Sequence, residues 1–561
     1  MNELVLNPPQ STPHVLNPRL LKAPSLVLAL CLMLLAGCGV PPEEGPKDSF
    51  SIDFSLPPDS ARRGTLVFFV DGVNATVFEE MLHKGELPAI QKYFVDRGTY
   101  VRRGVTNVPS VTLPNLTSFA TGQFPGHHNI TGINWWDRNR LVWRDYTTIA
   151  QKNTLDEDYN VPNIYEQFPD RLTFSVFFQP HRDTTKYYEN WTSAGPAFYF
   201  GWYKFVDRLT LYRLNEMMDV SRQYKQFPAI AVCYMLAPDF QGYAFGGSSP
   251  EYRQALRHTD YQIGRVLGDV QRGGLLDEIN IVFITDHGFG DAKTHFDLEG
   301  YLAKDLGLAV AAKHRWEREK FEQRLEDYSQ DTAMVYGSGD RFFAICLRKP
   351  IRKDGRVVDF EPWLTRPGEQ VLHYPTAHGD RDLVAELLKL QSMDVVAYPV
   401  DTDVVRVANT AGEVEFRQKG GRNATITYHV LKGSDPLGWQ KHLSSDALAG
   451  KGLSSRAWFD MTAGSDLPDL PAQILAYFRA PRAGDIAAFA KPDYDFRNSN
   501  KGGHGGVRPV DMYIPMLIAG PGIPKQTLYH ARTVDLFPTI LQVQGRTLPA
   551  NLDGQSLVKK P

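Results

Sequence analysis

The sequence predicts an α/β fold in which helices cover a mostly parallel central sheet. Four apolar runs predict strands, at residues 65–70, 229–239, 279–288 and 512–522. These runs lack the alternation of apolar and polar residues, which is typical of strands buried on both faces. Helical segments lie between the runs, for example at 76–95 and 251–271, and this order of elements is characteristic of the α/β class.

The first 37 residues are expected to form a signal peptide of the lipoprotein type. An apolar run at 25–37 follows Arg19 and Lys22 and leads directly into Cys38. The run is shorter than the roughly 20 residues of a membrane-spanning helix but suits a signal-peptide core. Leu35-Ala36-Gly37-Cys38 resembles a bacterial lipobox, in which the cysteine carries the lipid anchor. The alternative is an ordinary secretory signal that contains a cysteine.

The lipobox interpretation places the protein in the bacterial cell envelope, anchored through Cys38 to the outer membrane and facing the periplasm or the cell surface. Residues 38–63 are rich in proline, serine and acidic residues, which predicts a flexible tether. Cys233 and Cys346 lie in apolar runs, so we expect them in the core rather than in a disulfide or a metal site. A metal site must therefore use histidine, aspartate and hydroxyl groups.

The remaining chain is divided into a core and an insertion. The α/β core is expected at 64–310 and again at 491–561, and an inserted α+β subdomain at 311–490. The insertion begins with a charged helical stretch and contains the alternating segment 404–417, which predicts a hairpin. The formal net charge of the 561 residues is −3, so the chain has no overall nucleic-acid-binding signature.

Polar residues follow three of the predicted strands. Asp71, Asp239 and the pair Asp286-His287 stand at or just after the ends of the apolar runs. Ligands of α/β sheets bind at the carboxyl ends of the strands, so one shared site is expected there. Each aspartate alone could instead cap a helix. An adjacent carboxylate and imidazole, followed by Gly288, favour a metal, and zinc accepts this mixture of oxygen and nitrogen ligands.

A hydroxyl-rich segment, Pro109 to Ser118, leads into a predicted helix. A hydroxyl at a helix N-terminus lies beside unpaired backbone N–H groups and the positive end of the helix dipole, which favours a phosphate group there. A metal ion bound to the same oxygen would make it a nucleophile near neutral pH. Alternatively, the segment contains only a Ser/Thr N-cap.

The ordered motifs resemble the nucleotide pyrophosphatase/phosphodiesterase family of the alkaline phosphatase superfamily. The similarity covers roughly 64–310 and 480–558, and it rests on VDG (70–72), TLPN (112–115), TGQFPGHH (121–128), PDFQG (238–242), TDHG (285–288), GGHGG (502–506) and VDLFPTI…LDG (534–554). The resemblance implies an alkaline-phosphatase-like α/β sandwich with two zinc ions, which would hydrolyse phosphoesters.

The resemblance also implies roles for individual residues. Thr112 would attack phosphorus and form a phosphothreonine intermediate, and Asn115 would donate a hydrogen bond to a phosphate oxygen. One zinc would be bound by Asp71, Thr112, Asp286 and His287. The second would be bound by Asp239 and His504.

One position departs from the family pattern D-x-x-G-H. Tyr243 stands where the second zinc should have a histidine, so the second site is expected to be weak, to hold another metal or to recruit a histidine such as His295. A phenol with a pKa of about 10 is a costly ligand without a strong cation nearby. The family's equivalent of His127 and His128 is structural, so they are given no metal.

Three functions stay open at this point. The first is a phosphodiesterase or nucleotide pyrophosphatase that acts on a small phosphate ester or a nucleotide-like substrate. The second is a phosphomonoesterase on the same fold, for which Arg102, Arg103 or Lys293 would supply positive charge. The third is a catalytically weak binding lipoprotein. Trp135 and Trp136 belong either to the core or to a surface that stacks on a base. The sequence does not determine the substrate or the oligomeric state.

Overall fold

The computed structural model describes residues 51–561 except 149–150, 190–194, 196, 198, 314–319, 422–423, 497–498 and 559–561. The signal peptide, Cys38 and most of the expected tether therefore lie outside the described residues. None of the helices in the described part is long and apolar enough to cross a membrane.

An eight-stranded sheet forms the centre of the fold, in the order β25-β2-β24-β8-β1-β7-β5-β6. Every neighbouring pair is parallel except the two that contain β24. The mostly parallel sheet predicted from the apolar runs is thus confirmed. Its strands are β1 (Thr65–Val70), β2 (Thr99–Val105), β5 (Thr173–Val176), β6 (Lys186–Tyr188), β7 (Ile230–Met235), β8 (Asn280–Ile284), β24 (Tyr513–Ala519) and β25 (Gln526–Arg532).

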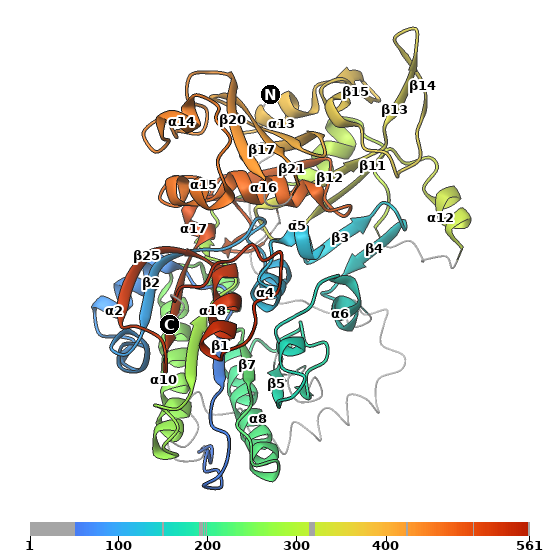
Figure 1. Ribbon diagram of the computed structural model, residues 1–561. Helices are drawn as coiled ribbons and strands as arrows, with labels where there is room; N and C mark the ends of the chain where they lie inside the picture. Colours follow the sequence, from blue (N-terminus) through green and yellow to red (C-terminus); the bar gives the residue numbers. More distant parts are fainter. Residues whose placement is uncertain are drawn as a thin grey trace.

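Helices cover both faces of this sheet (Figure 1). Alternate residues of β1 enter different cores: Val67 and Phe69 pack with α4 (Thr112–Thr121) and α18 (Leu536–Val543). Leu66 and Phe68 pack with α2 (Ala75–His83), α8 (Tyr203–Gln223) and α10 (Pro250–Arg272). Burial on both faces is the physical reason for the unbroken apolar runs.

A second sheet lies beside the first and is formed by residues 333–490, in the order β11-β12-β21-β17-β18-β19-β20 (Figure 1). All its pairs are antiparallel, including the predicted hairpin at 404–417. Its strands are β11 (Ala333–Gly337), β12 (Phe342–Leu347), β17 (Met393–Asp401), β18 (Val404–Asn409), β19 (Gly412–Lys419), β20 (Thr425–Lys432) and β21 (Ile486–Ala490).

Short strand pairs and helices complete the described part. The pairs are β3 (Asn134–Asp137) with β4 (Val142–Asp145), β9 (Gly290–Asp291) with β23 (Gly502–Gly503), β10 (Thr294–His295) with β22 (Tyr494–Asp495), β13 (Pro350–Lys353) with β14 (Arg356–Phe360), and β15 (Tyr374–Thr376) with β16 (Gly379–Arg381). The other α-helices are α3 (Pro88–Ile90), α5 (Pro125–His128), α6 (Leu155–Asp158), α9 (Ala237–Phe245), α11 (Leu298–Gly300), α12 (Phe321–Asp327), α13 (Leu383–Leu388), α14 (Ser445–Leu448), α15 (Ser455–Thr462), α16 (Leu470–Arg479) and α17 (Pro509–Met512).

Two expected elements differ from the sequence prediction. The helix expected at 76–95 is divided, because α2 ends at His83 and the chain turns at Gly85 (φ +72°) before α3 and a π-helical segment, Gln91–Val95. The run 229–239 is only partly a strand. Leu236 is the N-cap of α9, so Asp239 lies in the first turn of that helix.

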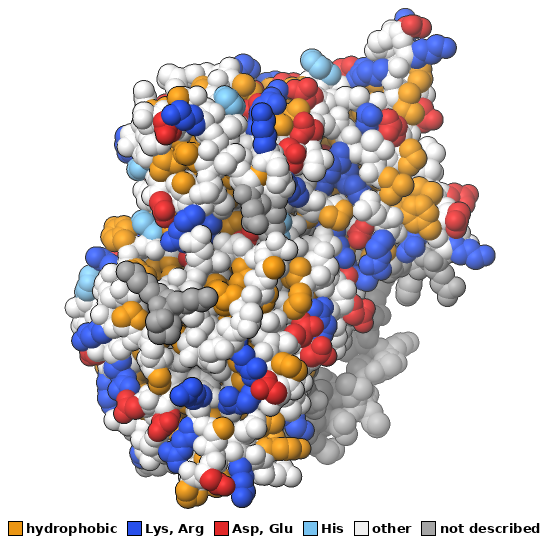
Figure 2. Space-filling model, in the orientation of Figure 1, with side chains coloured by type: hydrophobic (Ala, Val, Ile, Leu, Met, Phe, Trp, Pro, Cys, Tyr) orange, Lys and Arg blue, Asp and Glu red, His pale blue; other side chains and the backbone are white. Residues whose placement is uncertain are grey.

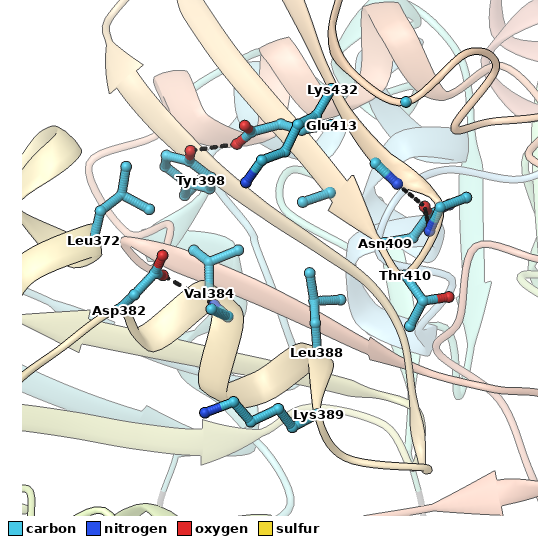
Figure 3. A pocket seen from close by; sticks show the side chains of 15 residues that line it. Leu372, Asp382, Val384, Leu388, Lys389, Tyr398, Asn409, Thr410, Glu413 and Lys432 are labelled. Atoms are coloured by element: carbon cyan, nitrogen blue, oxygen red, sulfur yellow. Dashed lines mark hydrogen bonds between the residues drawn. The ribbon is translucent and has the colours of Figure 1, made fainter.

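Charged side chains of both signs are mixed over the face shown in Figure 2, as the small net charge suggests. A cavity of about 510 Å³ lies in the second sheet's region, between α13 and the β18–β19 hairpin (Figure 3). Its lining includes Val384, Tyr398 and Lys432, and it contains none of the predicted site residues.

Candidate metal centre

The predicted aspartates meet at the carboxyl edge of the large sheet. Strand β1 lies between β7 and β8 in register, so the three strands end at the same level. Asp71 directly follows β1, and Asp286 stands two residues beyond β8. A Cβ atom on Gly72 (φ +64°) would lie 2.6 Å from Asp239 Oδ1, so glycine permits the close approach of β1 and α9.

Asp71 and Asp286 each have one oxygen held by the protein. Asp286 Oδ1 accepts hydrogen bonds from the backbone N–H of Gly72 (3.1 Å) and of His287 (3.1 Å) and from the Thr285 hydroxyl (3.2 Å). Asp71 Oδ2 accepts one from the Tyr234 hydroxyl. The other oxygens, Asp71 Oδ1 and Asp286 Oδ2, are buried and accept no hydrogen bond from the described residues. These are the oxygens available to a cation.

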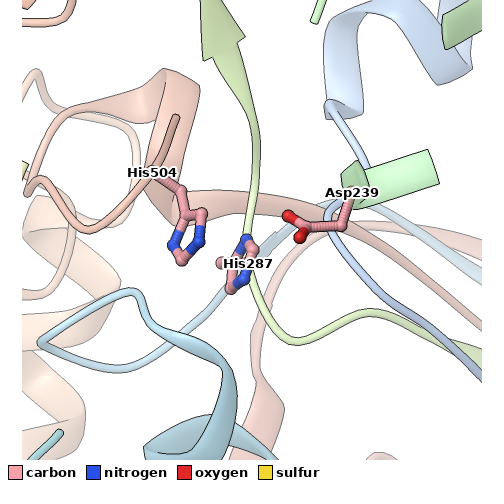
Figure 4. Close-up of side chains that lie close together, drawn as sticks. All are labelled: Asp239, His287 and His504. Atoms are coloured by element: carbon pink, nitrogen blue, oxygen red, sulfur yellow. The ribbon is translucent and has the colours of Figure 1, made fainter. Parts of the chain in front are cut away.

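The two histidines are oriented in the same way. His287 Nδ1 lies 2.9 Å from the Gly288 carbonyl, and His504 Nδ1 lies 2.8 Å from the Ser110 carbonyl. A carbonyl can only accept, so each Nδ1 carries the hydrogen and each Nε2 keeps its lone pair. The rings stack 3.5 Å apart at 9°, and Figure 4 shows the Asp239 carboxylate directed toward His287.

The ligand atoms form two clusters that share His287. The first cluster consists of Asp71, Asp286 and His287, and the second of Asp239, His287 and His504. In each cluster the atoms lie within 4.8 Å of one another, and all these residues are buried. The structure thus brings together every predicted metal-binding aspartate and histidine.

The electrostatics of the first cluster fit a cation. Burial, together with the neighbouring Asp239 and Asp286, raises the pKa of Asp71 well above its usual value. Among the described residues, no lysine or arginine forms an ion pair with Asp71 or Asp286. Buried carboxylates without a cationic partner are costly, and a bound metal ion removes that cost.

Thr112 lies at the edge of the first cluster. It is the first residue of α4, and its Oγ1 is 3.2 Å from His287 Nε2. Unlike the clustered ligands, its side chain is only partly buried, so a substrate can reach it. Helix N-termini favour phosphate, and the role of Thr112 as nucleophile stays a prediction.

Asn115 is placed differently from its predicted role. Its Nδ2 donates to the carbonyls of Pro109 (3.0 Å) and Val111 (2.9 Å), and its Oδ1 accepts from Thr106 and Asn107. The fully buried amide holds the loop before Thr112. A hydrogen bond from Asn115 to phosphate would require these contacts to break.

Tyr243 reaches the second cluster. Its hydroxyl lies 2.6 Å from His504 Nε2, and its ring packs edge-on against Phe289. His295, the alternative ligand, belongs to neither cluster, and its Nδ1 lies 3.5 Å from Asp495 Oδ2.

Other candidate residues have partners elsewhere. Trp135 and Trp136 are 0% exposed, so they are core residues and the base-stacking interpretation is wrong. His127 contacts Asp553, and buried His128 contacts the Ser118 hydroxyl. The charges proposed for a phosphomonoesterase are also engaged: Arg102 and Arg103 pair with Glu79, and Lys293 pairs with Asp493.

Sequence reasoning missed several residues that orient the site. Tyr234 lies inside the apolar run of β7, and nothing in that run predicts that its hydroxyl contacts the site. Asp207 accepts hydrogen bonds from the backbone N–H of Leu236 (2.7 Å) and Ala237 (3.2 Å) at the start of α9. Arg341, from the second sheet's region, donates to the Gly503 carbonyl (2.6 Å) next to His504. Their spacing in the sequence follows no motif.

The fold and the two clusters define an α/β protein with a buried centre of aspartates and histidines beside a helix N-terminus. Comparison with known proteins identifies the family. The model described as type I phosphodiesterase / nucleotide pyrophosphatase matches residues 65–358, just over half of the chain, and the chain belongs to this family.

Curated relatives agree with this assignment. An uncharacterized pyrophosphatase/phosphodiesterase of Schizosaccharomyces pombe is 24% identical over 276 residues, which are 45% of this chain and 50% of that protein. Ectonucleotide pyrophosphatase/phosphodiesterase family member 1 is 27% identical over 261 residues in Rattus norvegicus and 28% in Mus musculus. These matches cover 45% of this chain and 26% of each mammalian protein. The matched region thus spans half or less of these relatives.

Proposed function

We propose that this protein is a metal-dependent phosphoric ester hydrolase that cleaves phosphodiesters or nucleotide pyrophosphates with Thr112 as the nucleophile. The observation that carries the proposal is the position of Thr112 Oγ1, 3.2 Å from His287 Nε2 at the accessible edge of a buried ligand cluster. The names of the relatives support the reaction class.

The residues suggest how the reaction proceeds. Thr112 Oγ1 lies beside His287 Nε2, the nitrogen that would bind the first cation, so the hydroxyl oxygen faces the same cation position and would attack phosphorus from there. The new Oγ1–P bond replaces the bond to the leaving alcohol or nucleotide, and water then hydrolyses the phosphothreonine. Asp71, Asp286 and His287 would hold one cation, and Asp239 and His504 a second. Bound zinc would lower the pKa of the hydroxyl and neutralise phosphoryl charge.

Replacing Thr112 tests the proposal. We expect Thr112→Ala to lose roughly 10³-fold or more in kcat/KM, as nucleophile removal does in other hydrolases, with an unchanged melting temperature. Activity would be measured on a panel of diesters, pyrophosphates and monoesters. Thr76→Ala is the matched control, because Thr76 is an exposed threonine in the first turn of α2.

Acid quenching during turnover should also trap phosphate on the peptide that contains Thr112, detected by mass spectrometry. Near-normal activity of Thr112→Ala would make Ser110 or a water molecule the nucleophile. The buried Ser110 hydroxyl donates instead to the Gly506 carbonyl at 2.6 Å. A preference for monoesters in the panel would favour the phosphomonoesterase alternative.

A further inference from the structure

Helix α9 directs two oxygen side chains toward the second cluster. Asp239 and Tyr243 are four residues apart, so they share one face of the helix. The Tyr243 hydroxyl meets His504 Nε2 at 2.6 Å. Because His504 Nδ1 carries its hydrogen toward Ser110, the contacted Nε2 is the nitrogen that a metal ion would bind.

The phenol is held in this position by its surroundings. The ring of Tyr243 packs at 80° against Phe289 with centroids 5.2 Å apart, and at 68° against Phe240 at 6.1 Å. Edge-to-face packing on two sides fixes the direction of the hydroxyl. The Tyr243 hydroxyl is thus held in the position that a metal ligand would occupy.

We propose that Tyr243 is a ligand of the second cation beside Asp239 and His504, with His287 left to the first cation, and that the set Asp239, Tyr243 and His504 binds a harder cation than zinc, with ferric iron as the best match. The inference rests on the proposed function, since it completes the same metal centre. On binding, the phenol O–H bond breaks, its proton leaves to solvent, and the oxygen forms a bond to the ion. No electron is transferred.

Geometry and charge both support this assignment. Two neighbouring ligands at about 2.0–2.1 Å from one octahedral ion lie roughly 2.9 Å apart, so the 2.6 Å contact needs to open by only about 0.3 Å. Two anionic oxygens and one imidazole form a harder donor set than the one oxygen and two imidazoles of the family pattern. Hard oxygen donors favour hard, highly charged ions.

Iron loading of the full-length protein tests the proposal. Metal-free protein would be loaded with ferric iron, zinc or both, and metal content and visible absorption would be recorded. We expect a visible phenolate-to-iron charge-transfer band at one iron per chain, with tyrosine ring modes enhanced in the resonance Raman spectrum. Tyr243→Phe should lose the band while its melting temperature and the first-cluster zinc are retained.

Tyr234→Phe is the matched control, because Tyr234 is a phenol of the centre that donates its hydrogen bond to Asp71 and does not contact His504 Nε2. It should retain the band. Bound iron without a band, a band that survives Tyr243→Phe, or a second site that prefers zinc over ferric iron in competition would each overturn the proposal. These readouts do not depend on turnover. An active Thr112→Ala variant would contradict the proposed function, whereas the metal and absorption measurements decide the role of Tyr243. The failure of one proposal is therefore distinguishable from the failure of the other.

Discussion

At the scale of single residues, the ligands are oriented through the atom that does not face the centre. Asp286 uses Oδ1 for three hydrogen bonds, and His287 and His504 use Nδ1 for backbone carbonyls. Such outer contacts fix the tautomer and ring orientation of metal ligands and increase metal affinity. The ligand geometry is therefore set before any ion binds.

Tyr243 differs from these ligands, because its hydroxyl contacts the His504 nitrogen that would bind a metal ion. Replacing Tyr243 therefore gives a prediction at the residue scale. We expect wild-type protein to hold about one zinc tightly and to lose a second easily, and Tyr243→His to raise zinc occupancy of the second cluster. A neutral imidazole binds zinc without first losing a proton from a group of pKa about 10. Chelator titration followed by elemental analysis measures both sites. Two zinc ions that resist chelation equally in the wild type would contradict this prediction.

The sequence predicted which residues form the centre better than how they are held. Asp71, Asp286 and His287 could be found because a carboxylate or imidazole that follows an apolar strand is a pattern of consecutive residues in the sequence. The hydrogen bond from Tyr234 to Asp71 joins residues that are 163 positions apart, so no local sequence pattern predicts it. The contacts of Asn115 are local, but they depend on the conformation of the loop before Thr112, which the sequence pattern does not specify.

At the scale of elements, α9 carries Asp239 and Tyr243 and depends on a buried carboxylate from α8. Asp207 accepts from the N–H groups of Leu236 and Ala237, which lie at the unpaired start of α9. We expect Asp207→Ala to lower the free energy of unfolding by about 1–3 kcal/mol, because these buried donors lose their acceptor. Urea unfolding monitored by circular dichroism measures the change.

The same carboxylate predicts a pH dependence. Burial raises the pKa of Asp207 from an ordinary 3.8 to about 7, so the folded state favours the protonated acid. Its stabilising contribution is complete below about pH 4 and is lost as pH rises through 7. Relative to Asp207→Asn, wild-type protein should therefore lose stability over this window. A constant difference from pH 4 to 8 would show that folding does not raise the pKa of Asp207.

Element prediction from sequence succeeded where burial determines the pattern. The buried runs gave β1, β7 and β8, and amphipathic α10 was found almost to its ends, at 250–272. The direction of β24 was not predicted, because a strand buried on both faces has the same composition whether it is parallel or antiparallel. The break in the helix after His83 requires the positive φ of Gly85. A single glycine in a helical pattern does not by itself predict such a break.

At the scale of the whole molecule, the lipobox hypothesis makes attachment to a membrane depend on Cys38, which precedes the described residues. We expect Cys38→Ser to leave the protein as an unprocessed precursor or to release it from membranes, because serine cannot accept the lipid of a lipobox. Fractionation and mass spectrometry of a tagged strain measure both effects, with Cys31→Ser as the control inside the signal. Unchanged size and membrane association in Cys38→Ser would contradict the lipobox prediction.

The large sheet and the second sheet's region meet at the centre through Arg341. This buried residue pairs with Asp511 at 2.6 Å and donates to the carbonyls of Gly503 (2.6 Å) and Asp291 (2.7 Å). The backbone N–H groups of Asp340 and Arg341 also donate to the His504 carbonyl at 3.0 and 2.9 Å. The segment before β12 therefore fixes the loop that carries His504.

Removing this arginine should affect stability and the second cluster separately. We expect Arg341→Met to lower the free energy of unfolding by about 3–5 kcal/mol, because Asp511 is left buried without its partner. The double variant Arg341→Met/Asp511→Leu should recover much of that stability, since both charges are then absent. It should still bind the second-cluster metal more weakly than the wild type, because the Gly503 and Asp291 carbonyls have lost their donor. Unfolding in urea and metal analysis of both variants separate the two effects. Full recovery of metal binding in the double variant would show that the hydrogen bonds of Arg341 to the Gly503 and Asp291 carbonyls do not orient His504.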